Sequence, residues 1–335
     1  MEQQLEEDVI RTSQKFIELK KEIGKYLVGN ESQLDLVLIG LLSNGHILLE
    51  SVPGLAKTLM VKLLSNVLDL DFKRVQFTPD LLPADLIGTE IYNPKSHLFE
   101  TIKGPVFTNL LLADEINRAP AKLQSALLEA MEEKQVSIGS ETFKLDDPFI
   151  VLATQNPIDQ EGTYLLPEAQ VDRFMMKVTI DYPARQEESE IIKRMAHPEK
   201  SMEVNQILSK EEIFETRKLV DKIYIDSKIE DFILDIVFCT RLKFEQLSER
   251  QNKDNLMFLK DLLERGASPR ASLNLILASK AHALLNQRTY VNLDDVKAVC
   301  FPVLCHRIRL SYEAEAEEFN EEGIISEIFK NLRSP

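Results

Sequence analysis

LLESVPGLAKTLMV (residues 48–61) has the pattern of a phosphate-binding loop that runs from a strand into a helix. The full pattern is G-x-x-x-x-G-K-[ST]; here Ser51 and Ala56 stand at the two glycine positions, and Lys57 and Thr58 are in place. Such a turn directs backbone N–H groups and the positive end of the helix at phosphate oxygens. Lys57 would contact the β- and γ-phosphates, and the Thr58 hydroxyl would bind Mg²⁺. Because a side chain restricts backbone angles that glycine adopts freely, the stretch alone leaves a chance match open.

Composition is typical of a soluble globular protein. The 335 residues are 44% hydrophobic and 28% charged, which allows one large domain or two of ordinary size. No apolar run reaches the roughly 18 residues of a membrane-spanning helix, and the acidic N-terminus is unlike a secretory signal. Cys239, Cys300 and Cys305 lie in apolar segments without paired spacing, so we expect a reduced, cytoplasmic protein.

The net charge of −15 argues against broad nucleic-acid binding, which depends on neutralisation of phosphates by Lys and Arg.

Short apolar runs alternate with helical patterns up to about residue 181. Continuous runs of this length suit strands that are buried on both faces, and the alternation predicts an α/β layer with a mostly parallel sheet. The predicted strands are 46–50, 74–77, 109–114, 149–154 and 177–180, and the helices between them are 58–68 and 121–133.

Beyond DYPAR (181–185) the pattern is almost entirely helical. Pro183 marks the predicted hinge, because the residue before a proline is disfavoured in helical geometry. We therefore expect two domains: an N-terminal helix plus an α/β core (1–183) and a helical domain (184–335). The predicted helices are 186–196, 210–224, 228–242, 272–287 and 293–308.

Two further strand ends carry polar groups. LLLADE (110–115) places Asp114 where it can hold Mg²⁺ through water, and Glu115 where it can polarise an attacking water. VLATQNP (151–157) ends in Asn156, which could orient that water. Alone, the first motif suits a solvated strand end and the second an ordinary Asn-Pro turn. Together with the phosphate loop, they favour nucleotide hydrolysis.

Two arginines are placed to clamp a nucleotide between domains or subunits. Arg173 in PEAQVDRF (167–174) is predicted to close a short helix before the fifth strand, and Arg270 in GASPRAS (266–272) to begin a helix of the second domain. A lone arginine is more often part of a surface salt bridge worth about 0–1 kcal/mol.

With these motifs in place, the chain resembles MoxR-family AAA+ ATPases over nearly its full length. The resemblance implies an AAA+ P-loop NTPase core, with a five-stranded parallel sheet flanked by helices, and a C-terminal all-α lid domain. The residues that carry it are VGNESQLDLVLIGLLSNGHILLESVPGLAKT, DEINRAPAKLQSALLEAMEEKQV, ATQNPIDQEGTYLLPEAQVDRF, SPRASL and YVNLDDV.

The resemblance implies ATP and Mg²⁺ as cofactors. It makes Asn156 a sensor, Arg173 an arginine finger that enters a neighbouring subunit's site, and Arg270 a second sensor on the lid. The implied catalytic residues are Lys57, Glu115, Asn156, Arg173 and Arg270, and the implied metal-binding residues are Thr58 and Asp114. The implied nucleotide-binding residues are Val28 and Gly29 on the adenine side and Ser51, Val52, Pro53, Gly54, Leu55, Ala56, Lys57, Thr58 and Leu59 in the loop.

Two features depart from the family pattern. The family's loop reads G-V-P-G-L-A-K-T, so Ala56 conforms, whereas Ser51 bears on the strength of nucleotide binding. The segment 244–266 is an insertion, which would form either a partner-specific helix or a plain surface excursion.

Two segments resemble hairpin insertions that face the central channel in hexameric relatives. They are 78–107 and 136–147, the latter with Gly139-Ser140 as its turn. His97, Leu98 and Phe99 are candidate substrate contacts, although an ordinary exposed loop tip fits them equally well.

The resemblance implies an ATP-driven remodelling or maturation factor, working as a ring, with six subunits in relatives. Its partner proteins would carry von Willebrand factor A domains. A nucleotide-gated switch with little turnover is the alternative, for which Ser51 is the argument. A DNA motor is disfavoured because the two insertions contain only Lys95, Lys103 and Lys144 as basic residues.

Overall fold

The computed structural model describes residues 2–157, 164, 166–196, 203–249 and 251–335. They group into two compact units. An α/β unit contains the described residues of 15–174 and 178–214, and a helical unit contains the residues up to Gln14, 175–177 and 215–335. Part of the stretch 153–174 that carries the family resemblance lies outside the described residues.

A five-stranded sheet forms the centre of the α/β unit, in the order β2-β5-β8-β1-β9. Its three inner strands are buried along their length, apart from the last residues of β1 and β8, as their continuous apolar sequences predict. Neighbouring strands β2 and β5, β5 and β8, and β8 and β1 run parallel. The strands are β1 (Ile47–Glu50), β2 (Phe72–Gln76), β5 (Leu110–Asp114), β8 (Ile150–Gln155) and β9 (Met176–Thr179).

Strand β2 differs from the prediction of burial on both faces. It lies at the edge of the sheet, and Lys73, Arg74 and Gln76 are exposed. An edge strand has only one neighbour to cover it, so its apolar content is lower than that of the inner strands.

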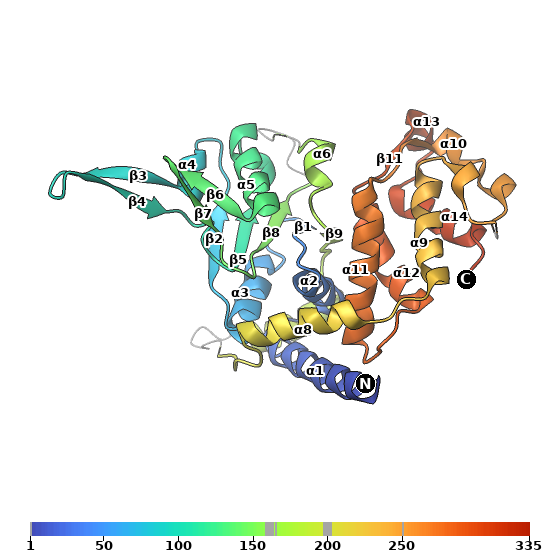
Figure 1. Cartoon of the computed structure of the whole chain (residues 1–335), viewed down its shortest axis with the longest axis horizontal. Coiled ribbons are helices and arrows are strands. Elements are labelled where there is room, and N and C mark those ends of the chain that lie inside the picture. The colour runs from blue at the N-terminus through green and yellow to red at the C-terminus, as the bar shows by residue number, and fades with distance from the viewer. Residues whose placement is uncertain (1, 158–163, 165, 197–202, 250) are drawn as a thin grey trace. The chain divides into compact units, whose positions relative to one another are not determined.

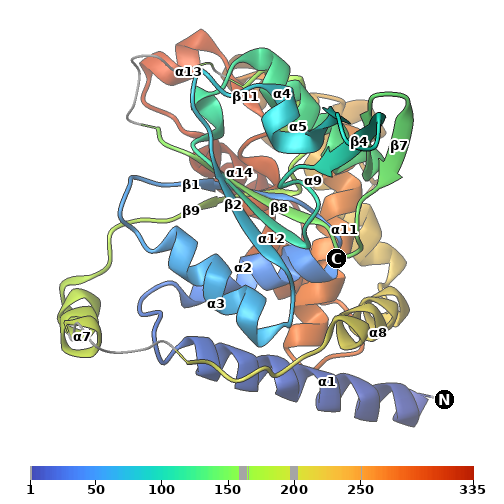
Figure 2. The same cartoon turned by 90° about the vertical axis from the view of Figure 1, so that its left-hand side faces the viewer.

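Helices cover both faces of the sheet. Figure 2 shows α2 (Glu31–Leu42) and α3 (Lys57–Val67) on one face, and α4 (Pro83–Ile87) and α5 (Ala121–Glu133) on the other. Helix α5 has its predicted bounds, and its predicted face of Leu123, Leu127 and Ala130 is buried. The remaining helices assigned wholly or partly to this unit are α1 (Glu2–Ile23), η1 (Ile116–Arg118), α6 (Glu168–Val171) and α7 (Arg185–Met195).

Both predicted insertions form two-stranded hairpins. The longer hairpin, β3 (Gly88–Asn93) with β4 (Leu98–Lys103), projects from the α/β unit (Figure 1). The shorter one joins β6 (Gln135–Ile138) to β7 (Glu141–Lys144) through Gly139-Ser140. Gly139 has φ +59, and a Cβ there would meet the Glu90 carboxylate, so the turn requires glycine.

The segment after Pro183 stays with the α/β unit up to residue 214. Arg194 donates to the carbonyl oxygen of Gly24 at 2.6 Å, and the backbone N–H of Ile207 donates to Val67 at 2.9 Å. The division into domains at residue 183 therefore remains a proposal.

The helical unit consists mainly of helices, and one short antiparallel pair joins β10 to β11. Its elements, the first of which begins in the α/β unit, are α8 (Lys210–Lys222), α9 (Ser227–Thr240), η2 (Phe244–Gln246), η3 (Lys253–Leu256), α10 (Leu259–Leu262), β10 (Leu263–Arg265), α11 (Pro269–Leu285), α12 (Leu293–Leu304), β11 (Arg309–Leu310), α13 (Tyr312–Ala316) and α14 (Glu321–Asn331).

The insertion 244–266 is neither a single added helix nor a surface excursion. Leu256 and Leu259 are fully buried, and Gln251 bonds the buried carboxylate of Asp235 at 2.9 Å. Leu256 and Leu259 therefore belong to the core of the helical unit, whereas Met257 and Phe258 are exposed.

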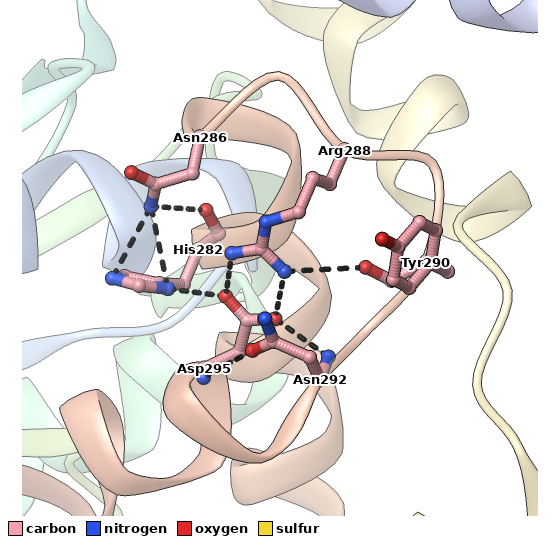
Figure 3. Close-up of polar contacts among 6 residues, drawn as sticks. All are labelled: His282, Asn286, Arg288, Tyr290, Asn292 and Asp295. Carbon is pink, nitrogen blue, oxygen red and sulfur yellow. Dashed lines mark hydrogen bonds and ion pairs between the residues drawn. The ribbon is translucent and has the colours of Figure 1, made fainter.

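A buried polar cluster fixes the connection between α11 and α12 (Figure 3). Asp295 is fully buried; it accepts hydrogen bonds from Arg288 and, at 2.6 Å, from Nδ1 of His282. Burial raises the pKa of Asp295, but the bonds from Arg288 and His282 outweigh this and hold it below its usual value. Asn292 completes a capping box with Asp295 at the start of α12.

All three cysteines are free, and Cys239 and Cys300 are buried. Burial raises the pKa of the Cys239 thiol to about 12, so it is inert as a nucleophile. Within the described part of the chain, every helix is too short or too polar to cross a membrane.

His46 provides a test of the core of the α/β unit. Its Nδ1 accepts from the N–H of Val151 at 3.0 Å, so the proton lies on Nε2, which donates to the carbonyl of Met131 at 3.1 Å. Burial lowers the pKa of His46 from 6.5 to about 4. As the pH falls, His46 is therefore protonated in the unfolded chain before it is protonated in the folded one. The contribution of His46 to the stability of the fold is complete above pH 6.5 and is lost as the pH falls towards 4.

We expect the free energy of unfolding to fall by about 2 kcal/mol through His46 between roughly pH 7.5 and pH 5, measured by urea denaturation. His46→Gln should be less stable at the higher pH and show a smaller pH dependence. The matched control His97→Gln, in the exposed turn of the long hairpin, should keep the wild-type pH dependence. An unchanged slope in His46→Gln would contradict the assignment.

Candidate functional site

The phosphate loop lies between the end of β1 and the first turn of α3. The N–H of Ser51 donates to the carbonyl of Gln155 at 3.1 Å and extends the β1–β8 pairing by one residue. The left-handed residues of the loop are Gly54 (φ +88) and Ala56 (φ +56). Of the two residues that replace glycines of the full pattern, only Ala56 therefore adopts a left-handed backbone that is unfavourable for a residue with a side chain. Ser51 adds no such strain.

Lys57 and Thr58 are the first residues of α3, where the N–H groups have no partner within the helix. The Lys57 ammonium donates to the carbonyl of Ser51 at 3.4 Å. Burial lowers the pKa of Lys57, and the nearby charges of Asp114 and Glu115 oppose that shift. The loop lysine and both acids therefore share one electrostatic environment.

Asp114 is the last residue of β5 and is buried. One carboxylate oxygen, Oδ1, accepts from the Thr154 hydroxyl at 2.6 Å. The other, Oδ2, accepts from Nε and Nη2 of Arg74 at 3.0 and 2.6 Å. Both oxygens are thus held in a fixed orientation by β8 and β2.

Glu115 adopts a left-handed backbone (φ +57) immediately after the strand. Its N–H donates to the Thr154 hydroxyl oxygen at 2.8 Å. Its carboxylate accepts from Gln76 at 2.8 Å and pairs with Arg118 at 3.1 Å. Both of these contacts are made by the same carboxylate oxygen of Glu115, Oε2.

Asn156 is buried and follows β8 directly. Its carbonyl accepts from Nδ2 of Asn117 at 3.5 Å. The parallel pairing of β8 with β1 and with β5 brings Asn156 to the edge where the loop and the acids lie.

The two arginines are placed differently from these groups. Arg173 lies in the turn after α6 rather than in the helix, and it pairs with Glu132 of α5 at 3.0 Å. Arg270 is exposed at the start of α11, where its N–H donates to the Ser268 hydroxyl at 3.2 Å. Arg270 belongs to the helical unit, so its place beside the loop remains a prediction.

Val28 and Gly29 precede α2. Gly29 has φ +79, and a Cβ there would lie 2.8 Å from the carboxylate carbon of Glu187, at the start of α7. The positive φ favours glycine here, and the segment lies close to the Glu187 side chain of the same unit.

The oxygen donors at the sheet edge fit Mg²⁺ by their chemistry. Mg²⁺ binds through one or two protein oxygens and completes its shell with waters and phosphates. Asp114 offers roughly four lone-pair positions, of which Thr154 and Arg74 occupy three. The remaining position is on Oδ1, and the Thr58 hydroxyl, in the first turn of α3, is the second oxygen that would hold the ion.

Sequence reasoning missed Thr154, Arg74 and Gln76. Gln76 is the last residue of β2 and Thr154 the last but one of β8, and a polar residue at a strand end is a usable signal; Arg74 lies within a strand and gives none. Their partners are fixed by the lateral order of the strands, which local sequence does not contain.

Comparisons with known proteins agree with this geometry. Residues 46–176 match the ATPase family associated with various cellular activities (AAA), and residues 259–328 match the AAA lid domain. The chain is 46% identical to Chaperone MoxR1 of Mycobacterium tuberculosis over 314 residues, covering 94% of this chain and 81% of the relative.

Two further matches cover almost the whole chain. The protein YeaC of Bacillus subtilis is 42% identical over 315 residues, which cover 93% of this chain and 92% of YeaC. A crystal structure of a protein from Cytophaga hutchinsonii superposes with a TM-score of 0.91 at 48% identity, covering 99% of this chain and 98% of that one.

Thr154 is a positioning residue whose role can be tested. Thr154→Val keeps the shape but leaves the Glu115 N–H and a carboxylate oxygen of Asp114 without this partner. We expect the free energy of unfolding to fall by about 2 kcal/mol and nucleotide affinity in Mg²⁺ to weaken. Thr154→Ser keeps the hydroxyl and should restore both, as measured by denaturation and calorimetry; equal behaviour of the two variants would refute the role.

Proposed function

Because this chain belongs to the MoxR family of AAA+ ATPases, we propose that it hydrolyses Mg²⁺-ATP to remodel or mature partner proteins. The observation that carries the proposal is the gathering of Lys57, Asp114, Glu115 and Asn156 at the carboxyl edge of one parallel sheet. Ligands bind at that edge in open α/β sheets.

Each of these residues has a role that its chemistry supports. The loop N–H groups and Lys57 bind the phosphates, with Val28 and Gly29 on the adenine side. Thr58 and Asp114 hold Mg²⁺, which supplies charge neutralisation at the phosphates when bound. Glu115 polarises the attacking water, and Asn156 orients it.

Arg173 acts on the site of the next protomer in a ring, which we propose to be a hexamer. Its side chain is 33% exposed, and its guanidinium pairs with Glu132, so this pair must open or reorient for the arginine to reach a neighbouring phosphate. Arg270 on α11 acts from the lid as the second sensor. A single subunit would then be nearly inactive, because its site lacks the charge of Arg173.

The long hairpin is the proposed contact surface for the client. Leu98 and Phe99 are 65% and 70% exposed, although they belong to opposite faces of the ribbon. Phe99 packs edge-on against Tyr92 at 5.5 Å between ring centroids, and Ile91 and Ile102 are also exposed. Apolar side chains on both faces of a projecting ribbon have no core to join, so they suit a partner protein.

A protein with a von Willebrand factor A domain is the proposed client, in the cytoplasm. The three unpaired cysteines support a reducing compartment. Ser51, the argument for a switch without turnover, lies outside the left-handed region, so it adds no backbone strain to the loop.

Mixing two inactive variants tests the shared site. Glu115→Gln and Arg173→Ala should each lose nearly all ATP turnover, since an arginine finger is worth about 10³–10⁵ in rate. Mixed in equal amounts, they should regain up to about a quarter of wild-type turnover, because sites then form with Glu115 from one subunit and Arg173 from the next. In the control mixture of Glu115→Gln with Lys57→Ala, both substituted residues belong to the subunit that binds the phosphates. Every site in this mixture keeps one defect, so ATP turnover should not recover.

Turnover per wild-type subunit should also rise with protein concentration. No recovery in the first mixture would refute the action of Arg173 in a neighbouring site. Full ATP binding without turnover in the wild-type chain would instead support the switch.

The client surface can be tested with the double variant Leu98→Ser/Phe99→Ser. Its affinity for a co-purified von Willebrand factor A-domain protein should fall at least about tenfold, whereas ATP turnover without client should stay at the wild-type rate. The control Tyr312→Ser alters an equally exposed aromatic residue in the helical unit. Unchanged affinity in the double variant would exclude the hairpin, and no binding to the wild-type chain would exclude this client.

A further inference from the structure

Arg74 has no part in the mechanism above, although it makes the closest cationic contact to Asp114. It lies within the edge strand β2, and its side chain is 46% exposed. Its Nε and Nη2 both donate to Oδ2 of Asp114, at 3.0 and 2.6 Å. Two donors of one guanidinium on one oxygen form a directed contact rather than a loose surface pair.

The partner of Arg74 is a buried carboxylate that needs a positive charge. Only 12% of the Asp114 side chain is exposed, and a buried carboxylate without a counter-ion is strongly unfavourable. Thr154 satisfies Oδ1 but carries no charge. Arg74 forms the direct ion pair with Asp114, at 2.6 Å, and the charge of Lys57 lies nearby.

We propose that Arg74 is the resident counter-ion of Asp114, which prevents divalent metal from binding before the nucleotide. A metal beside Oδ1 would experience repulsion from the guanidinium on Oδ2 of the same carboxylate. The phosphates of a nucleotide supply the negative charge that offsets this repulsion, so metal and nucleotide enter together. Arg74 is then a positioning residue that sets the order of binding, and this inference rests on the proposed role of Asp114 as the metal-holding acid.

The ion pair also joins β2 to the site mechanically. The N–H of Phe77, directly after β2, donates to the carbonyl of Asp114 at 2.8 Å. Asp114 is thus held through its main chain and its side chain by the same edge strand. Loss of the guanidinium would free the carboxylate without detaching the strand, so Arg74→Gln should fold.

The experiment titrates Mn²⁺ into nucleotide-free protein and follows free Mn²⁺ by electron paramagnetic resonance. Arg74→Gln should bind Mn²⁺ at least about tenfold more tightly than the wild-type chain, and Arg74→Lys should show a smaller rise because it retains a point charge. The gain should disappear in Arg74→Gln/Asp114→Asn. Arg118→Gln is the matched control: it removes a cation of similar exposure from Glu115 and should not produce the same gain.

Equal Mn²⁺ affinity in the wild-type chain and Arg74→Gln would overturn the proposal, and so would a gain that survives Asp114→Asn or that Arg118→Gln reproduces. Thermal unfolding checks that each variant is folded; if Arg74→Gln is not, the comparison of Arg74→Lys with the wild-type chain decides in the same way. ATP binding to the wild-type chain in Mg²⁺, measured by calorimetry, tests the proposed function separately. If ATP did not bind, the proposed function would fail, but the comparison of Mn²⁺ affinities would still test the role of Arg74.

Discussion

The parallel pairing of β8 with both β1 and β5 is the constraint on which the rest of this structure depends. Parallel strands bring their carboxyl ends to the same edge, so the loop after β1, the acids after β5 and Asn156 after β8 are neighbours although they are far apart in sequence. The register fixes how they meet: Ala113 of β5 pairs with Ala153 of β8. Asp114 and Thr154, one residue further along each strand, are therefore within reach of a hydrogen bond at 2.6 Å.

Within that edge, each charged group is held by a partner from a different element. Asp114 is bonded by Thr154 and Arg74, Glu115 by Gln76 and Arg118, and the Lys57 ammonium lies on the carbonyl of Ser51. Two of these partners, Arg74 and Gln76, come from β2, which is an edge strand with exposed polar residues. The outermost strand therefore contributes side chains to the site as well as sheet pairing, and the same strand leads along the chain to the projecting hairpin. The hairpin is thus linked along the chain to Arg74 and Gln76, the β2 residues that contact Asp114 and Glu115.

The long hairpin differs from the insertion in the helical unit, whereas the short hairpin buries Val136 and Ile138. The long hairpin exposes apolar side chains on both faces, which stabilises nothing within the α/β unit. Segment 244–266 instead buries Leu256 and Leu259 completely, and its short strand pairs with β11. The first insertion therefore adds a surface, whereas the second enlarges a core.

The sequence by itself determined the five strands, the helices α3 and α5 between them, the loop with Lys57 and Thr58, and the acids at the end of β5, because these depend on local periodicity and on residue types at fixed spacing. The structure of segment 244–266 could not be predicted from periodicity or spacing, because the burial of its leucines depends on the other elements of the helical unit. Tertiary structure alone decided that Ala56 rather than Ser51 takes a left-handed backbone, that β2 is an edge strand, and that Arg74 and Thr154 are the partners of Asp114. The reason is that contacts across a sheet depend on the order and register of its strands, and these are set by the packing of the whole unit.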